Sequence, residues 1–570
     1  MKNTENTVAL SVIRGVNFIG NSSNADNDVD SRAGAIRANN DSITILDNVV
    51  FMGNSSKAAG GAISTANNLN GSALGTFISI SNAYFKGNSV NMNKVGADGG
   101  AIRTGGALSM TNVQFVDNEN KKDLDGAALS FDGTSLRLVA DNGNVLFKGN
   151  IAKKDITGQQ SSSGIHIDGE NEKKIMFNAG NGGEVVFFDK IVNAGTFAGA
   201  NLTLELNKSN VLNATSTQLE QIYAKFFDAG GAYIGPTSKP AMQNTILGAD
   251  SVYWLSKEEA AAAGRLKEWN DLHEVEGIKT APTDGKIIFN TQISNTSLNL
   301  HNGELLLADE ITDEIRNKSY ITGNSNLNLY GGKLDVSNNN IESKGQLAFN
   351  KINVEGEAEL NLDIDIWNKT IDYLGTDSIT GTDKGKLVMS EIGILNESPN
   401  ESPTLSLGDG SEWFKFTGSN GVKTELSKMT QVIVTSNAGY YFTLGKRDGS
   451  TQNNAVKLYK VLSGGGLGVA LDSGSEFGIS MKQSGGVEIV NWAEKYNIYD
   501  PKTGKTYSNM VGTNVQKGAV FTLKGEKESV VKAGDGVKLL PAEILGTHTI
   551  KMKLPVSGKK ARKWPICPEQ

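Results

Sequence analysis

Residues 60–65 have the sequence GGAIST, and TFISISNAYFKGN follows in residues 76–88. The same order returns as GGAIRT in residues 99–104 and ALSMTNVQFVDN in residues 107–118. Each unit joins a Gly-Gly corner to alternating aliphatic residues and ends in the phrase Phe-x-x-Asn. Successive Phe residues of this phrase lie 33, 34, 30 and 32 positions apart, which predicts stacked supersecondary units. The phrase occurs at 18–21, 51–54, 85–88, 115–118 and 147–150.

The residues before each Phe follow the two-residue period of a β-strand. Ile43 and Ile45 alternate with polar residues in one unit, and Leu10 and Val12 do so in another. Gly-Gly and Asn-rich segments separate the strands, at places where a tight corner needs positive φ. The residue three positions before each Phe is small or an amide, namely Gly15, Asn48, Asn82, Asn112 or Asn144.

A strand repeat that has no helix in each unit predicts an all-β fold, a right-handed parallel β-helix in which each coil hydrogen-bonds to its neighbours. We expect the aliphatic and Phe side chains to stack inward, so that Phe51, Phe85 and Phe115 share one buried column. We also expect Asn residues at the turns to form ladders along the axis. A leucine-rich repeat is the structural alternative, but its L-x-x-L-x-L spacing is missing.

The sequence divides into four expected regions. Residues 1–210 form the β-helix with GGAI and Phe-x-x-Asn repeats, and residues 211–285 form a small helical insertion against its side. The β-helix continues over 286–494. A C-terminal β region with a basic tail spans 495–570.

The helical insertion is predicted from two capping-box patterns that precede apolar residues at helical spacing. Thr217-x-x-Glu220 begins the first helix, which Gly230 ends. Ser256-x-x-Glu259 begins the second helix, which Gly277 ends. We expect the two tryptophans of this segment to form its packing core, Trp254 and Trp269.

Composition limits the partners of the chain. A net charge of −7 and a pI near 5.5 leave no basic stripe to neutralise phosphates, which argues against nucleic acid. The single cysteine, Cys567, excludes an internal disulfide and a Cys-based zinc cluster. No stretch approaches the about 18 apolar residues of a membrane span. No signal-peptide pattern precedes the strands, which begin near residue 8, so we expect an internal piece of a longer gene product.

The GGAI and Phe-x-x-Asn repeats together resemble the polymorphic outer membrane protein repeat of chlamydial-type autotransporters, over about residues 8–205. LHNGELLL at 300–307 and LNLYGGKLDVSNN at 327–339 are similar to autotransporter passenger sequence. The resemblance implies a β-helical passenger, displayed at the cell surface or outer membrane or secreted, that usually serves adhesion. It implies a host or cell-surface protein or glycan as partner.

Many β-helices are polysaccharide lyases or glycoside hydrolases, and each of these activities needs its own pattern of residues. A polygalacturonase-like site needs adjacent aspartates and an R-I-K sequence, and neither occurs. The centre of residues 474–478, GSEFG, is Glu476 instead of the Ser of a nucleophile elbow. Four aspartates have the oxygen ligands that a hard cation prefers, but we expect them on the solvated face of a strand. They are Asp363, Asp365, Asp372 and Asp377.

The four histidines are scattered and form no HExxH sequence, so a zinc hydrolase has little support. We expect His166 to lie at a turn or on the surface. No catalytic, cofactor-binding or metal-binding residue is predicted. The histidines are His166, His273, His301 and His548.

The sequence therefore predicts a non-catalytic passenger that serves adhesion and structural display. A β-helical polysaccharide lyase or glycoside hydrolase is the alternative, and a tailspike-like trimer with apolar patches along one face is a third hypothesis. The repeat residues are expected to be structural, with adhesion as an added role. They are Gly60, Gly61, Ala62, Ile63, Gly99, Gly100, Ala101, Ile102, Phe18, Asn21, Phe51, Asn54, Phe85, Asn88, Phe115, Asn118, Phe147 and Asn150.

Overall fold

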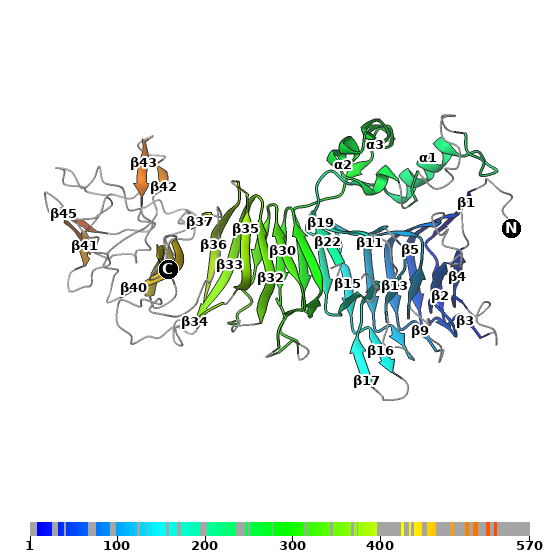
Figure 1. Cartoon of the computed structure of the whole chain (residues 1–570), viewed down its shortest axis with the longest axis horizontal. Helices are drawn as coiled ribbons and strands as arrows, with labels where there is room; N and C mark the ends of the chain where they lie inside the picture. The colour runs from blue at the N-terminus through cyan, green and yellow to red at the C-terminus, as the bar shows by residue number, and fades with distance from the viewer. Residues whose placement is uncertain are drawn as a thin grey trace. The chain divides into compact units, whose positions relative to one another are not determined.

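The repeated strands wind into successive coils of a parallel β-helix in the computed structural model (Figure 1). Up to residue 395 most of the chain is described, and after it only separate strands between 423 and 532 are described. The ranges are 8–24, 32–38, 42–65, 76–91, 99–121, 126–133, 135–154, 159–167, 173–193, 202–234, 246–248, 251–275, 277–312, 315–316, 318–341, 346–365, 370–372, 374–382, 384–395, 423–426, 432–434, 438–446, 453–462, 480–483, 496–500, 505–510, 520–524 and 529–532.

Contacts divide the chain into two compact units. The first contains Met1–Leu334 and Ala348–Glu355, and the second contains Asp335–Leu347 and Gly356–Gln570. Coils on either side of the helical insertion pair directly with one another, so the β-helix continues after the insertion.

In the first unit, each coil begins with a long strand that pairs in parallel with the same strand of the next coil. These strands are β1 (Ala9–Arg14), β5 (Ser42–Met52), β8 (Thr76–Lys86), β11 (Ala107–Val116), β14 (Ser135–Asp141), β19 (Lys174–Gly180), β22 (Leu202–Leu206), β27 (Thr296–Leu300), β30 (Asn326–Leu329) and β32 (Leu347–Val354).

A corner then turns the chain onto a second parallel face. The second halves of β5, β8 and β11 belong to this face, with β2 (Asn17–Ile19), β15 (Val145–Lys148), β20 (Glu184–Phe187), β25 (Lys286–Phe289) and β28 (Glu304–Leu307).

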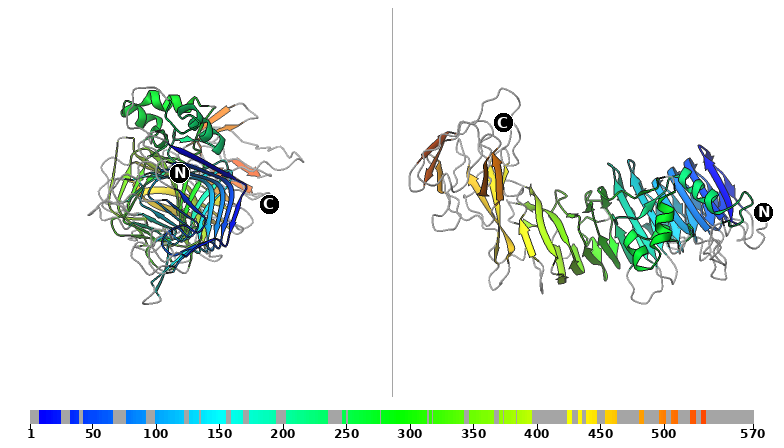
Figure 2. Two further views of the ribbon diagram at one scale, coloured as in Figure 1. Left: turned by 90° about the vertical axis from the view of Figure 1, so that its right-hand side faces the viewer. Right: turned by 90° about the horizontal axis from the view of Figure 1, so that it is seen from above.

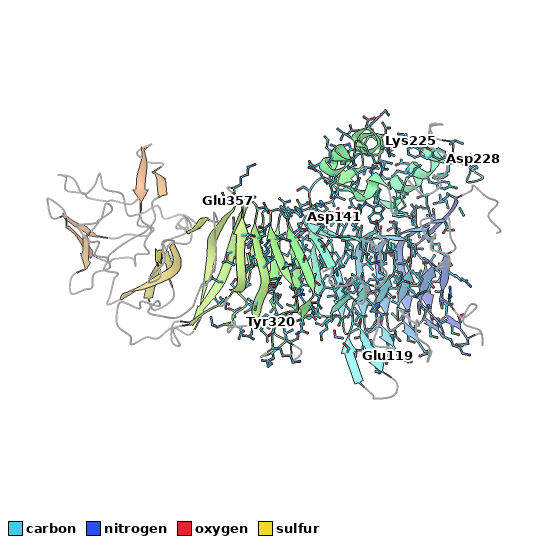
Figure 3. The ribbon with its side chains drawn as sticks, viewed as in Figure 1. Glu119, Asp141, Lys225, Asp228, Tyr320 and Glu357 are labelled. Atoms are coloured by element: carbon cyan, nitrogen blue, oxygen red, sulfur yellow. The ribbon has the colours of Figure 1, made fainter. Side chains whose placement is uncertain are left out.

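Two further sheets close the N-terminal coils. One contains β3 (Ser22–Ser23), β6 (Ser55–Ser56), β9 (Ser89–Val90), β12 (Glu119–Asn120), β16 (Ile151–Lys154) and β17 (Gln159–Ser162). The other contains β4 (Ile36–Ala38), β7 (Ile63–Thr65), β10 (Ile102–Thr104), β13 (Leu129–Phe131), β18 (Ile165–Ile167) and β21 (Ile191–Asn193). Asp141 and Glu119, labelled in Figure 3, lie at opposite edges of the coils.

The inward side chains form uninterrupted columns. Phe51, Phe85 and Phe115 share one buried column, as the repeat predicts. Neighbouring rings in this column are parallel within 14° and have centroids 4.7–5.2 Å apart. The spacing is close to that of neighbouring β-strands, so the backbone ladder itself brings each ring onto the next. The complete column is Phe18, Phe51, Phe85, Phe115, Phe147, Phe187 and Phe289.

The corner between the two long faces uses a residue at positive φ. Asn48, Asn82 and Asn112 have φ values of 52°, 50° and 53°, a region that Asn tolerates better than most residues because its amide bonds locally. In the fifth coil the residue at positive φ is Asn142, two positions before Asn144. Three residues separate β14 from β15, so the turn begins earlier there.

The helical insertion leaves the β-helix at this same corner. β22 ends at Leu206, Asn207 has φ 50°, and the second face resumes only at β25. Because the corner makes no ladder pair of its own, a long segment fits there without breaking the stack. The segment contains β23 (Leu212–Asn213), α1 (Ser216–Phe226), a 3₁₀ turn (Val252–Trp254), α2 (Lys257–Ala262), α3 (Leu266–His273) and β24 (Lys279–Thr280).

Helix boundaries differ in part from the sequence expectation. Thr215, not Thr217, caps α1, and its capping box uses Gln218. The predicted box of Ser256 and Glu259 is confirmed. The second predicted helix is divided into α2 and α3 near Gly264, whose φ is 69°. Within the described residues, none of the helices has both the length and the apolar character to traverse a bilayer.

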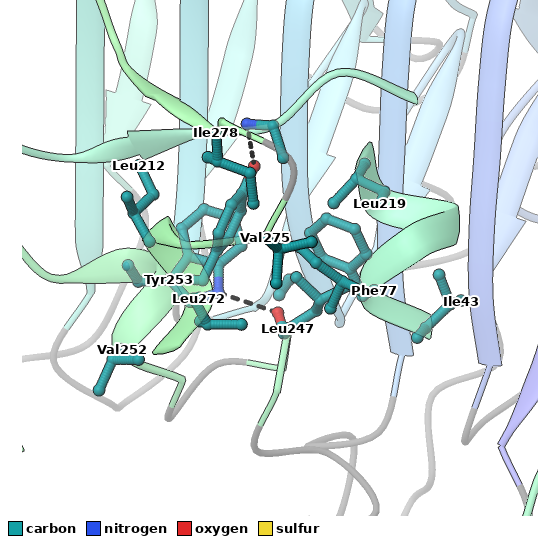
Figure 4. Packing of buried hydrophobic residues seen from close by; sticks show 14 of the residues in the cluster. Ile43, Phe77, Leu212, Leu219, Leu247, Val252, Tyr253, Leu272, Val275 and Ile278 are labelled. Atoms are coloured by element: carbon teal, nitrogen blue, oxygen red, sulfur yellow. Dashed lines mark hydrogen bonds between the residues drawn. The ribbon is translucent and has the colours of Figure 1, made fainter. Parts of the chain in front are cut away.

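The insertion covers the outer face of the N-terminal long strands (Figure 2, left; Figure 4). Ile43, Ile45 and Phe77 point outward from β5 and β8 and are buried in one cluster with insertion residues. The predicted packing role of Trp254 and Trp269 is confirmed, since each is at most 3 % exposed in this cluster. Apolar residues therefore occupy both faces of these strands.

Arg137 is fully buried between β14 and the insertion. Its guanidinium donates to the backbone oxygens of Leu212 and of Tyr253, the latter at 2.6 Å. It also lies 4.5 Å from the Tyr253 ring centroid and 4.9 Å from that of Trp254. Burial lowers the pKa of Arg137. Carbonyl dipoles and aromatic faces thus stabilise a desolvated cation.

The second unit begins with parallel strands and continues with antiparallel ones. β33 (Glu357–Asp365) pairs in parallel with β36 (Lys386–Leu395), which pairs in parallel with β37 (Lys423–Leu426). β38 (Val432–Val434), β39 (Ala438–Lys446) and β40 (Asn453–Leu462) are antiparallel, unlike the coils expected up to residue 494.

Smaller sheets and strands complete the structure. They are β26 (Ile293–Ser294), β29 (Ile321–Thr322), β31 (Lys333–Asp335), β34 (Thr370–Ile371), β35 (Leu374–Gly381), β41 (Ser480–Gln483), β42 (Tyr496–Asp500), β43 (Lys505–Met510), β44 (Val520–Lys524) and β45 (Ser529–Lys532).

Phe85→Ala is expected to lower the free energy of unfolding by about 3–5 kcal/mol, because it removes a fully buried ring and leaves a cavity between two stacked neighbours. Chemical denaturation followed by circular dichroism measures the change. Lys86→Ala, at the exposed neighbouring position, is expected to stay within about 0.5 kcal/mol of the wild type. Equal losses in both variants would contradict the buried column.

Arg137→Lys is expected to destabilise the protein by about 3 kcal/mol, because an ammonium stays desolvated but cannot donate as a planar fork to both carbonyl oxygens. Denaturation gives the magnitude, and tryptophan fluorescence reports the ring of Trp254 beside the substituted residue. Lys267→Met, where the side chain is 87 % exposed, is the control. An unchanged fluorescence and stability would show that Arg137 does not fix the insertion.

Candidate functional site

The predicted repeat residues lie in the interior of the coils. Ala62, Ile63, Ala101 and Ile102 have no exposed surface. The Phe and Asn residues of the second to fifth coils are equally buried, and only the first coil differs, where Phe18 is half-buried and Asn21 is exposed. Apart from the first coil, these side chains cannot reach a partner on the surface.

The Asn residues of the phrase form a continuous ladder along the axis. Asn88 donates from its backbone N and its Nδ2 to Oδ1 of Asn118, at 3.0 and 2.9 Å. The same Nδ2 also donates to the backbone oxygen of Phe51 at 3.0 Å. Each amide therefore satisfies buried polar groups of two neighbouring coils. The ladder contains Asn21, Asn54, Asn88, Asn118 and Asn150 and ends at Asp189.

Steric contacts explain why both residues of the Gly-Gly corner are glycine. Gly60 has φ 62°, and a Cβ on it would lie 1.9 Å from the oxygen of Ile63. A Cβ on Gly61 would lie 2.1 Å from the oxygen of Gly100 in the next coil. The first glycine thus permits the turn and the second permits close approach of the coils.

Two of the four predicted acidic residues are not on a solvated face. Asp363 is 2 % and Asp372 is 1 % exposed, so that expectation is wrong for both. Their carboxylates accept backbone hydrogen bonds, from Asn339 N to Asp363 at 2.7 Å and from Asp363 N to Asp372 at 2.5 Å. They cap local backbone in the second unit. The side chains of Asp365 and Asp377 lie outside the described residues.

His166 is buried in β18, with 3 % of its surface exposed, so its expected place at a turn or on the surface is wrong. Ile165, not His166, aligns with Leu129 of the coil before it. In the described part of the chain, no group of three or more His, Cys, Asp and Glu residues is arranged to hold a metal ion.

A polar patch on the outer face of later coils is the candidate binding surface. It starts where the insertion leaves the coils. We call it the amide face, and it consists of Glu205, Asn299, His301, Asn328 and Tyr330.

Hydrogen bonds join the amide face into one network. Asn328 Nδ2 donates to Asn299 Oδ1 at 2.7 Å, and Asn299 Nδ2 donates to Glu205 Oε1 at 2.8 Å. His301 Nε2 lies 2.6 Å from Glu205 Oε2. The His301 ring stacks on that of Tyr330, with centroids 4.7 Å apart and planes 6° apart. Tyr330 is 45 % exposed, one of five large hydrophobic side chains that are exposed among the described residues.

Charges around Glu205 keep its carboxylate ionised. Burial opposes this ionisation, but the bond to His301 and the charge of Lys208 outweigh it, so the pKa of Glu205 lies below its ordinary value. Burial, together with the carboxylates of Glu205 and Glu355, raises the pKa of Tyr330. The phenol therefore stays protonated and offers a hydroxyl donor at the surface.

No family model, curated protein or solved structure matches this chain. The chemistry of the amide face must therefore be inferred from its own geometry. Amide, carboxylate and phenol groups on a fixed sheet can exchange hydrogen bonds with a polar partner, and the Tyr330 ring adds an apolar contact.

The sequence did not single out the amide face. His301 is one of four scattered histidines, and Asn328 and Tyr330 lie within the segment 327–339 that is similar to autotransporter passenger sequence. The available signal was the register: Glu205, Asn299 and Asn328 occupy the same strand position in three coils. The shared position of Glu205 and Asn299 can be recognised only when the strands of these two residues are aligned directly, with the insertion between them left out.

Asp189 occupies the ladder position in the sixth coil and is 2 % exposed. Its Oδ2 accepts from Asn150 N and Nδ2 at 3.1 and 2.5 Å, and its Oδ1 accepts from Ser162 Oγ at 3.0 Å. Burial raises the pKa of Asp189 despite these bonds. A carboxylate thus replaces an amide at a site that disfavours charge.

Asp189→Asn is expected to raise the melting temperature near neutral pH, because Asn keeps the acceptor for Asn150 and removes the desolvated charge. A folded-state pKa above the unfolded value means that the wild type loses stability as pH rises through the folded pKa. The gain should therefore grow as the pH rises above about 4, the ordinary pKa of Asp. Thermal scans at a series of pH values above about 4 test it.

Asp309→Asn, at an exposed position, is the control for the loss of one negative charge. Its effect should not increase in the same direction with pH. A pH-independent difference between the Asp189→Asn variant and the wild type would contradict the assignment.

Proposed function

We propose that this chain is a non-catalytic β-helical passenger of the autotransporter type, displayed at the cell surface or secreted, and that its amide face is the adhesive surface. The partner is a host or cell-surface protein or glycan. The repeats that resemble chlamydial-type passengers support the first part of this proposal. The second part is independent of that resemblance.

The observation that carries the proposal is that the inward and the outward side chains of the coils have different roles. The repeat residues of the second to fifth coils are used in contacts between coils, so adhesion must use outward side chains. The amide face presents such side chains from β22, β27 and β30, whose backbones are fixed by parallel pairing. Because Glu205, Asn299 and His301 are already held in one network, these side chains lose little conformational entropy when a partner binds.

The test compares attachment of full-length chain, coupled to fluorescent beads, to cultured epithelial cells. The double variant Asn328→Ala and Tyr330→Ala removes an amide and the exposed ring. We expect attachment to weaken at least about tenfold, which corresponds to about 1.4 kcal/mol. Gln114→Ala, a half-buried outward residue of β11 on another face, is the matched control.

Circular dichroism verifies that both variants keep the fold. Unchanged attachment of the double variant would refute the assignment of the amide face. Failure of the wild-type chain to attach, with turnover of a polysaccharide that Glu205→Gln abolishes, would favour the alternative lyase or glycoside hydrolase. In that case the pair of Glu205 and His301 would act as the proton-transferring groups.

A further inference from the structure

The strands that carry the amide face have polar residues at their outward positions. Side chains alternate between the two faces of a strand, and the inward neighbours, such as Leu298 and Leu327, are fully buried. The register of β22, β27, β30 and β32 then places the outward residues in two rows that cross the coils. The rows are Thr203, Ser297, Asn326 and Lys351, and Glu205, Asn299, Asn328 and Asn353.

This composition differs from that of a surface that binds another protein. The centre of a protein–protein interface is apolar and depends on a cluster of aromatic or aliphatic anchors. Of the five large hydrophobic side chains that are exposed among the described residues, Tyr330 is the only one at the amide face. A single ring among amides suits a ligand that combines hydroxyl groups with small apolar faces, and a sugar has such a surface.

Several polar groups of the amide face have hydrogen-bonding capacity that the chain itself does not use. Asn328 donates through Nδ2 to Asn299, but its Oδ1 accepts no hydrogen bond from a described residue. His301 Nδ1 and Tyr330 Oη also have no hydrogen-bond partner among the described residues. An amide offers donors and an acceptor together, which matches sugar hydroxyl groups that both donate and accept.

The Tyr330 ring offers an apolar surface beside these polar groups. It stacks on His301, with ring centroids 4.7 Å apart, and still keeps 45 % of its surface exposed. An aromatic ring with a polar end suits the C–H face of a pyranose, whose hydroxyl groups then reach the amides. The polar rows repeat from coil to coil at about 4.8 Å, the spacing of neighbouring strands, which is close to the length of one sugar residue.

The charges around the ring disfavour an acidic sugar. Burial raises the pKa of Tyr330 most, the carboxylates of Glu205 and Glu355 raise it further, and the charge of Lys208 opposes them less strongly. Lys208 is itself paired, with Nζ 2.6 Å from Glu259 Oε1 and 3.7 Å from Glu205 Oε2. A carboxylate or sulfate of the ligand would therefore meet charge of the same sign.

These carboxylates do not make the amide face a site for a basic peptide. Glu205 accepts a hydrogen bond from Asn299 and contacts His301, and Glu355 accepts one from Asn353. A lysine or arginine of a partner would have to replace these bonds, so its net gain is small.

We propose that the ligand of the amide face is an uncharged glycan, whose sugar residues stack on Tyr330 and exchange hydrogen bonds with the amides of successive coils. This rests on the proposed adhesive function, and it narrows the partner from a protein or glycan to a neutral glycan. Asn328 and Tyr330 supply the groups that the chain leaves unused, and Asn299 holds Asn328 in place through the bond to its Oδ1.

The test measures attachment of the full-length chain, coupled to fluorescent beads, to epithelial cells whose surface sugars have been altered. Periodate followed by borohydride cleaves the sugars at their vicinal diols, and cells given borohydride alone are the control. We expect attachment of the wild-type chain to weaken at least about tenfold after periodate. Removal of acidic sugars with sialidase and heparin lyases should not weaken it, because the neutral sugars remain.

A comparison of variants on both kinds of cell assigns the glycan to the amide face. On control cells the double variant Asn328→Ala and Tyr330→Ala should attach at least about tenfold more weakly than the wild type. On periodate-treated cells the two should attach equally, because groups that contact each other do not contribute independently. Gln114→Ala, on another face, should respond to periodate as the wild type does.

Three results would overturn the neutral glycan. Attachment that periodate leaves unchanged would indicate a protein partner, and attachment lost after sialidase or heparin lyase would indicate an acidic glycan. Losses from periodate and from the double variant that multiply would place the glycan on another surface. Failure of the wild-type chain to attach to control cells would instead refute the proposed adhesive function and, with it, the glycan partner.

Discussion

The parallel hydrogen-bond ladder between successive coils constrains everything else in the first unit. It sets each residue about 4.8 Å from its counterpart in the next coil, so a side chain meets mainly copies of itself. Aromatic rings and amides can satisfy that constraint, because Phe stacks on Phe and Asn both donates to and accepts from Asn. Carboxylates cannot do so without cost, and Asp189 accordingly stands at the end of the Asn ladder.

This constraint separates scaffold from surface. The inward columns must repeat, whereas the outward residues may differ from coil to coil without disturbing the ladder. The chain uses this freedom in two ways. The outer face of the N-terminal coils is apolar and covered by the insertion, and the outer face of β22, β27 and β30 is polar and carries the amide face. The insertion leaves the β-helix at the corner that directly follows β22, at Asn207.

The candidate site could be predicted only in part, for a physical reason. Phe51 and Asn54 recur at a fixed period and are easily recognised, but recurrence reflects packing inside the stack and not contact with a partner. Glu205 and Tyr330 do not recur, and the insertion separates Glu205 from its neighbour Asn299 in sequence by 94 positions. Sequence patterns reveal the packing residues that recur in every coil. They do not reveal a contact that the ladder forms only once, between residues far apart in sequence.

The sequence by itself determined the parallel β-helix, the shared Phe column, the Asn ladder and the presence of helices after residue 210, because strand period, repeat length and capping residues are local signals. Only the tertiary structure decided that Asp363 and His166 are buried, that Arg137 is desolvated under Trp254, and that the strands of 432–462 are antiparallel. These properties depend on which distant segment covers a residue or pairs with a strand, and no local pattern encodes that.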